Sequence, residues 1–136
     1  MDRYLGRYST YVYAILRIVS GFVFILYGTQ KFFAYPPMPS GMKGGPLSTL
    51  LIVAAAIELI AGLMIMFGLF AGIAAFIASG EMAVAYFMVS QPMAAWPPSN
   101  NGTAAVLFCF IFLYIASRGS GLWSIDSLRG AGVSSV

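Results

Sequence analysis

The sequence predicts an all-α membrane protein, a polytopic bundle of four transmembrane helices. Of its 136 residues, 60% are hydrophobic and only 8% are charged, whereas roughly 25% of the residues in a soluble domain are charged. Clusters of proline and glycine separate four apolar segments, and such clusters end helices because they remove backbone donors or adopt positive φ. A helix crosses a bilayer with about 20 mostly apolar residues. Each of the four segments is therefore a candidate membrane span.

The predicted helices follow one another along a single transmembrane domain, residues 1–136. The first covers residues 11–33 and ends at the loop "AYPPMPSGMKGGP". The second, 47–67, is joined to the third, 69–89, by the short turn "FGLF". After the loop "QPMAAWPPSNNG" comes the fourth and shortest helix, residues 103–116.

The distribution of positive charge predicts the orientation of this bundle. The side of the membrane that holds both termini carries Arg3, Arg7, Arg118 and Arg129. The opposite side, with the two proline-rich loops, carries Lys31 and Lys43. Because arginine and lysine are enriched in cytoplasmic segments, we expect both termini to lie in the cytoplasm.

Composition also argues against several kinds of function. The seven Lys and Arg residues are scattered along the chain, so no basic stripe indicates nucleic-acid binding. The chain has one cysteine, Cys109, and no histidine, which removes the commonest ligands of zinc, copper and haem. No haem, flavin or iron–sulfur motif is recognisable. We expect no metal site and no self-contained catalytic motif.

Two cations lie in the first apolar helix. Arg17 and Lys31 are separated by 13 residues, which span about 20 Å in a helix, against a hydrocarbon core of about 30 Å. If Lys31 extends to the outer interface as an anchor, Arg17 lies within the inner leaflet. Both cations share a face of roughly 80° with Gly21 and Gly28. This face is predicted to pack on other helices, because glycine allows close backbone approach in membranes.

Two carboxylates lie near the middle of the next two predicted helices. Glu58 shares its face with small residues such as Gly62, and Glu81 shares its face with alanines such as Ala78. A charged residue at the bilayer centre costs roughly 2.5–3.5 kcal/mol on insertion scales, so both carboxylates are expected to face the interior of the bundle.

The sequence therefore predicts a buried polar cluster of Arg17, Glu58 and Glu81. One arginine neutralises one carboxylate, and the second would be protonated or hydrogen-bonded to tyrosine or backbone groups. Such a cluster suits proton transfer or contact with a quinone. The alternative interpretation is a packing role, because buried ion pairs also fix which helix contacts which. Gln30, beside Lys31, is a candidate contact for a lipid headgroup or a quinone carbonyl at the outer interface.

Three stretches resemble the DoxX family of small four-helix membrane proteins. They are Arg17 with "GFVFILYGTQKFF", "IELIAGLMIMFGLFAGIAAFIASGEMAVAYFM", and "AAVLFCFIFLYIASRGSGLWSID". The resemblance implies a bacterial inner-membrane subunit near quinone or redox chemistry, since the family includes proteins associated with quinone-linked sulfur oxidation and with oxidative-stress complexes. It places the family's polar residues at Arg17, Lys31, Glu58 and Glu81.

Two functional hypotheses stay open at this point. In the first, the protein is a subunit of a quinone-linked redox assembly, and its polar cluster contacts quinone or lipid or relays protons while a partner protein supplies electrons. In the second, it is an accessory subunit without chemistry that anchors or stabilises a larger membrane complex. A transporter is disfavoured, because the chain shows neither an inverted repeat nor a broken helix.

Overall fold

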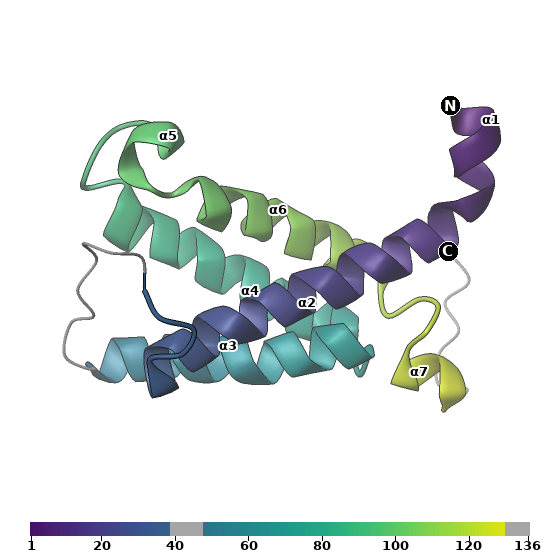
Figure 1. Cartoon of the computed structure of the whole chain (residues 1–136), viewed down its shortest axis with the longest axis horizontal. Coiled ribbons are helices and arrows are strands. Elements are labelled where there is room, and N and C mark those ends of the chain that lie inside the picture. The colour runs from purple at the N-terminus through teal and green to yellow at the C-terminus, as the bar shows by residue number, and fades with distance from the viewer. Residues whose placement is uncertain (39–47, 130–136) are drawn as a thin grey trace.

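The fold is entirely helical across the part of the chain that the computed structural model describes, residues 1–38 and 48–129. The N-terminus forms α1 (Asp2–Leu5) and the 3-10 turn η1 (Gly6–Tyr8), which lead into α2 (Ser9–Phe33). The sequence predicted the first long helix over residues 11–33. Figure 1 shows that α1 bends away from the direction of α2. Residue 43, a lysine used in the charge comparison, lies outside the described residues.

The remaining elements follow the order expected from the apolar segments. They are α3 (Thr49–Phe67), α4 (Ala71–Ala85), the π-helical segment η2 (Tyr86–Ser90), α5 (Pro97–Asn100), α6 (Thr103–Arg118) and α7 (Ile125–Leu128). The predictions for these segments were 47–67, 69–89 and 103–116, with α5 and α7 unforeseen. Residue 47 is not described.

Three of the described helical stretches are long and apolar enough to cross a membrane. They are Asp2–Phe33, Thr49–Phe67 and Ala71–Ser90. The helix α6 is apolar but has only 16 residues, a length of about 24 Å at 1.5 Å per residue. The chain is thus a helical membrane protein, and its outer surface contacts lipid.

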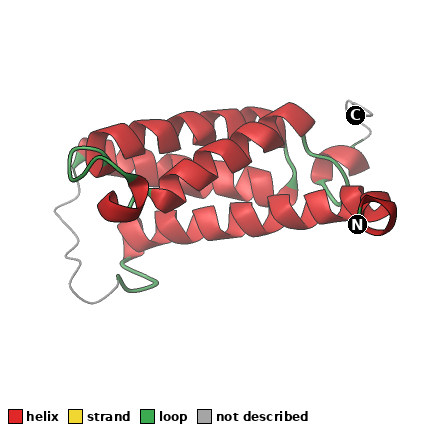
Figure 2. Cartoon of the chain, turned by 90° about the horizontal axis from the view of Figure 1, so that it is seen from above, coloured by secondary structure: helices red, strands yellow, loops and turns green. Residues whose placement is uncertain are grey.

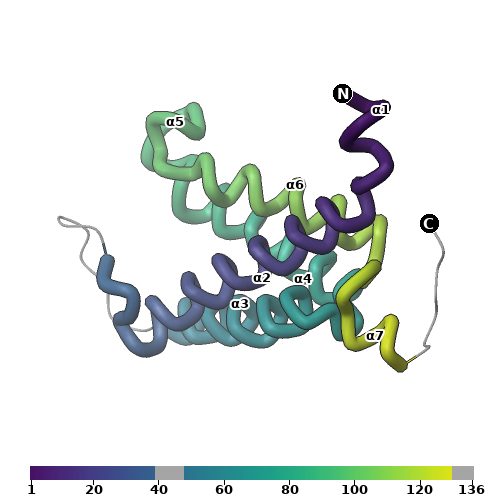
Figure 3. Tube along the Cα trace, turned by 45° about the vertical axis from the view of Figure 1, so that its right-hand side comes forward, coloured from purple at the N-terminus to yellow at the C-terminus, as the bar shows by residue number. Residues whose placement is uncertain are grey.

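The helices α2, α3, α4 and α6 lie side by side (Figure 2). The pair α2 and α3 packs closely, as does the pair α4 and α6, and α3 and α4 join the two pairs. Figure 3 shows these two pairs along the trace, with α7 at the same end of the molecule as the N-terminus. Aromatic side chains complete the contact between the pairs: the ring centroids of Phe24 on α2 and Phe112 on α6 are 4.7 Å apart.

Glycine allows α2 and α3 to touch through their backbones. A Cβ atom on Gly21 would lie 2.6 Å from the backbone nitrogen of Met66 and 2.8 Å from the carbonyl oxygen of Gly62. These distances are too short for any side chain, and Gly28 is packed in a similar way against Leu59. The prediction that the glycine face of the first helix packs on another helix is confirmed, and it brings the cations of α2 beside α3.

Candidate functional site

Arg17 is completely buried at the junction of α2, α3 and the segment after α6. Its Nη1 atom donates hydrogen bonds to the carbonyl oxygens of Ile65 at 2.8 Å and Met66 at 3.0 Å. Its Nη2 atom donates to the carbonyl oxygens of Leu122 at 2.9 Å and Trp123 at 2.8 Å. One side chain thereby joins three segments of the chain.

The position of Arg17 follows from the electrostatics of the end of α3. The last four carbonyl groups of a helix lack partners within the helix, and the C-terminus carries a partial negative charge. Ile65 and Met66 belong to this last turn, and α3 ends at Gly68 with φ +70°. A cation with several hydrogen-bond donors pairs with these carbonyl oxygens and neutralises the partial negative charge. Arg17 is therefore bound by backbone dipoles.

The predicted pairing of Arg17 with a buried carboxylate is wrong. Among the described residues, the hydrogen-bond partners of its guanidinium are four carbonyl oxygens, and neither Glu58 nor Glu81 bonds to it. Side-chain charges alone do not reveal the partner of Arg17. A helix C-terminus is also negative, and the turn after Phe67 lies beside Arg17 when α2 and α3 run antiparallel.

Three further side chains belong to the same network: Tyr13, Ser120 and Asp126. Together with Arg17 we name them the Arg17 hub. The Tyr13 hydroxyl donates to the carbonyl oxygen of Gly119 at 2.6 Å. The backbone nitrogen of Phe70, just before α4, donates to Asp126 Oδ2 at 2.8 Å, and the Ser120 hydroxyl donates to the same oxygen at 2.6 Å. The hub therefore fixes the C-terminal segment against the ends of α2, α3 and α4.

A second polar cluster lies further along α2. The Lys31 Nζ atom donates to Glu58 Oε1 on α3 and forms an ion pair with it. The Glu58 side chain is 1% exposed, whereas that of Lys31 is 24% exposed. The long lysine side chain thus connects the surface with a carboxylate in the interior. The sequence assigned Lys31 to the interface as an anchor; the structure gives its ammonium a specific partner inside the bundle, which the sequence did not predict.

Glu81 on α4 lies within electrostatic reach of both Glu58 and Lys31. We name these three residues the Lys31 cluster. Within the described parts of the chain, the Oε2 atoms of Glu58 and Glu81 are buried and have no hydrogen-bond partner. Lys31 is paired with Glu58, and Glu81 has no ion pair among the described residues. The cation paired with Glu58 is therefore Lys31, in the place expected for Arg17.

Gln30 holds the chain that leaves α2. Its Nε2 atom donates to the carbonyl oxygens of Pro36 at 3.1 Å and Pro37 at 3.4 Å. The amide nitrogen predicted to contact a headgroup or a quinone is therefore bonded to the loop. No group of three or more His, Cys, Asp or Glu side chains suited to a metal ion occurs among the described residues.

Comparison with known proteins identifies the family. The family model DoxX matches residues 12–91, which is more than half of the chain. The chain belongs to the DoxX family. An uncharacterized protein from Haemophilus influenzae is 38% identical to it over 126 residues, covering 90% of this chain and 94% of that protein. No solved structure matches the chain.

The part matched by the DoxX model contains one complete polar cluster and half of the other. Lys31, Glu58 and Glu81 all lie within residues 12–91, whereas Ser120 and Asp126 of the Arg17 hub lie beyond them. Sequence reasoning missed the partners in the hub. The one available signal was Asp126, a carboxylate in the short segment after the last apolar helix, where it suits the capping of a helix N-terminus.

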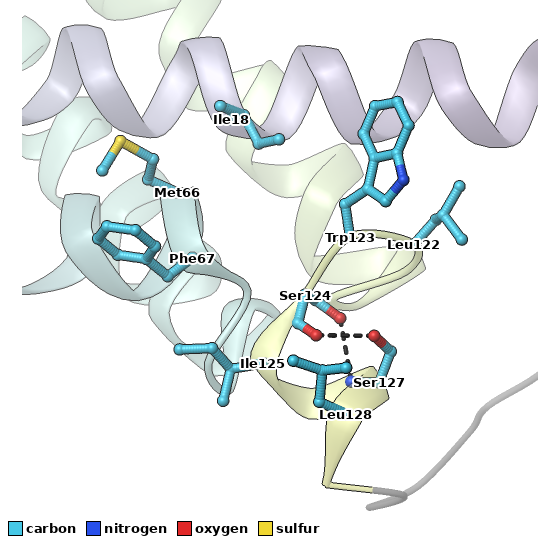
Figure 4. Close-up of a pocket in the computed structure, with 9 residues that line it drawn as sticks. All are labelled: Ile18, Met66, Phe67, Leu122, Trp123, Ser124, Ile125, Ser127 and Leu128. Atoms are coloured by element: carbon cyan, nitrogen blue, oxygen red, sulfur yellow. Dashed lines mark hydrogen bonds between the residues drawn. The ribbon is translucent and has the colours of Figure 1, made fainter.

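This DoxX protein also has an open apolar groove of about 610 Å³ beside the hub. Figure 4 shows Met66 and Phe67 of α3 on one side of it and Trp123 with α7 on the other. The lining residues are Ile18, Met66, Phe67, Leu122, Trp123, Ser124, Ile125, Ser127 and Leu128. Arg17 lies behind the groove, since its carbonyl partners belong to Met66, Leu122 and Trp123.

Proposed function

We propose that this DoxX protein is a multi-pass subunit of a quinone-linked redox assembly in the bacterial inner membrane. In this proposal, the Lys31 cluster contacts the quinone and holds protons. The observation that carries the proposal is the imbalance of this cluster. The Lys31 ammonium is paired with Glu58, the second carboxylate, Glu81, has no ion pair among the described residues, and both carboxylates keep a buried oxygen without a hydrogen-bond partner there. The Arg17 hub also holds two such atoms, Arg17 Nε and Asp126 Oδ1, so the excess of titratable carboxylates distinguishes the Lys31 cluster from it.

The residues of the cluster suit contact with a quinone. A quinone, when bound, supplies two-electron chemistry coupled to protons. The partly exposed Lys31 ammonium is a donor for a carbonyl oxygen at the surface of the bundle. Glu58 connects that ammonium to the interior, and Glu81 is the next group able to hold a proton. These residues provide donors, acceptors and charge, and a partner protein would supply the electrons.

The proposal includes four membrane crossings, with both termini in the cytoplasm. The three long helical stretches are candidates by length and composition, and α6 would cross as a shorter fourth span. The positive-inside bias supports this orientation. In it, the Arg17 hub lies on the cytoplasmic side, and the Lys31 cluster lies nearer the outer side.

The test compares carboxylate-to-amide substitutions at three positions. Glu58→Gln and Glu81→Gln remove charge from the cluster with little change in shape, and Asp2→Asn makes the same chemical change at the exposed N-terminus. The complex would be purified in mild detergent and its turnover measured with decyl-ubiquinone, alongside its yield. We expect at least a tenfold loss of turnover for Glu81→Gln at normal yield, and no change for Asp2→Asn.

An accessory role without chemistry is the second candidate, and the Arg17 hub favours it. This network uses a fully buried arginine to join helix ends and the C-terminal segment, so part of the polar chemistry of the chain serves assembly. Full turnover with reduced yield in both glutamine variants would support the accessory role and rule against the redox proposal.

A further inference from the structure

The apolar groove beside the Arg17 hub is separate from the Lys31 cluster, and its lining indicates what it binds. Seven of its nine lining residues have apolar side chains, and several of these are well exposed: Leu128 is 88%, Trp123 is 54% and Phe67 is 51% exposed. Its volume of about 610 Å³ falls within the roughly 300–1,000 Å³ of small-molecule sites. An apolar occupant of substantial length therefore fits.

The hydroxyl groups of the groove and two of its backbone carbonyl oxygens are already hydrogen-bonded. The Ser124 hydroxyl donates to the carbonyl oxygen of Gly121 and accepts from the backbone nitrogen of Ser127, and the Ser127 hydroxyl donates to the carbonyl oxygen of Ser124. The carbonyl oxygens of Leu122 and Trp123 are bonded to Arg17. A peptide segment in the groove would find no free hydroxyl group for its own N–H and C=O groups, which need partners when buried. A hydrocarbon chain has no such groups.

A positively charged side chain, that of Arg129, lies next to the groove. Arg129 directly follows the lining residue Leu128, and its side chain is 45% exposed. Its guanidinium packs over the ring of Phe70 with a separation of 4.9 Å and is 3.6 Å from Asp126 Oδ1. Arginine has five N–H donors, so one long ion pair leaves most of them available. An apolar groove with a neighbouring cation matches a molecule with a hydrocarbon chain and an anionic head.

We propose that this groove is a binding site for an anionic phospholipid, with one acyl chain between α3 and α7 and the phosphate near Arg129. The site lies at the end of the bundle that holds the N-terminus and α7 (Figure 1). The lipid would cover the exposed side chains of Phe67, Trp123 and Leu128, and it would cover the loop that Arg17 holds in place.

The experiment uses Trp123 as the reporter. In the full chain with Trp96→Phe, Trp123 is the one remaining tryptophan. The protein would be placed in phosphatidylcholine nanodiscs containing increasing fractions of acyl-brominated phosphatidylglycerol or acyl-brominated phosphatidylcholine. Since a cation near the surface gives roughly a fivefold preference for anionic lipid, we expect half-maximal quenching of Trp123 at a phosphatidylglycerol fraction about fivefold lower. Equal curves for the two lipids would overturn the proposal.

Charge variants distinguish binding of anionic lipid at the groove from a general attraction of the protein to anionic membranes. Arg129→Gln should remove the preference for phosphatidylglycerol, whereas Arg7→Gln removes one exposed charge away from the groove and should retain it. Ile125→Ser with Leu128→Ser should weaken quenching by both lipids at low fractions, with the helical circular dichroism signal unchanged. If Arg129→Gln and Arg7→Gln reduce the preference equally, the attraction is nonspecific and the assigned site is wrong.

Other occupants give different results. Deletion of residues 130–136 should leave the quenching curves unchanged; a large increase in quenching would mean that this segment covers the groove. A nanodisc that holds two copies and protects Trp123 from both lipids would assign the groove to a second copy. Ubiquinone extracted in place of phospholipid from the purified protein would assign it to a quinone tail. Each of these three results overturns the phospholipid site.

Discussion

Arg17 and Lys31 lie on one face of the same helix, yet the two cations are neutralised in different ways. Arg17 is fully buried and bonds to four backbone carbonyl oxygens. Lys31 is partly exposed and bonds to the Glu58 carboxylate. Carbonyl dipoles do not titrate, so the first arrangement is suited to holding the fold together. A carboxylate can gain or lose a proton, so the second arrangement retains a capacity for chemistry.

The largest expected effect comes from breaking the Arg17 hub. Arg17→Met removes hydrogen bonds from a charged donor that are each worth about 1.5–3 kcal/mol, so we expect a loss of at least roughly 5 kcal/mol in the free energy of unfolding. Unfolding by dodecyl sulfate in mixed micelles, followed by circular dichroism, measures this loss. Arg7→Met, at an exposed arginine, is the control and should change little. Equal stability of the Arg17 variant and the wild type would contradict the structural role of the hub.

The Lys31 cluster should respond asymmetrically to the loss of either partner. Lys31→Met leaves the buried Glu58 carboxylate unpaired and should cost roughly 3 kcal/mol, measured by the same unfolding assay. Glu58→Gln should cost less, because the partly exposed ammonium of Lys31 can turn to the surface. The double variant Lys31→Met with Glu58→Gln should regain most of the stability lost in Lys31→Met. Equal losses in the two single variants would contradict this reasoning from exposure.

The smallest of the three effects is expected at Tyr13, which contributes one hydroxyl group to the Arg17 hub. Tyr13→Phe deletes the hydroxyl that donates to the carbonyl oxygen of Gly119 and should cost about 1 kcal/mol. The ring remains, so its contact with the Arg118 guanidinium, 4.7 Å from the ring centroid, should persist. Tyr4→Phe on the exposed α1 is the matched control. A loss as large as that of Arg17→Met would mean that the hydroxyl, and not the guanidinium, is the centre of the hub.

The features that sequence reasoning predicted are those determined by composition and periodicity. Low charge and long apolar segments suffice for a helical membrane protein, and Gly21 and Gly28 on one face suffice for a close helix contact. The burial of Glu58 follows from the cost of a charge in hydrocarbon. Each of these inferences depends on residues within one helix, where the geometry is known in advance.

The partners of the cations could not be inferred in the same way. Choosing between Arg17 and Lys31 as the partner of Glu58 requires the vertical register of α2 against α3, and the glycine contacts of the folded bundle set that register. The carbonyl groups that bind Arg17 have no signature in the sequence, because every residue has one. The roles of Ser120 and Asp126 depend on a segment about 100 residues from Arg17 returning to the same end of the bundle.

The sequence by itself determined that this chain is helical, enters a membrane and carries buried charge, because hydrophobicity and helical periodicity are local properties. The tertiary structure alone decided that Arg17 binds backbone carbonyls, that Lys31 reaches Glu58, and that a groove forms between α3 and α7. These features arise where helix ends and distant segments meet. Their energies depend on distances between groups, which the order of residues does not state.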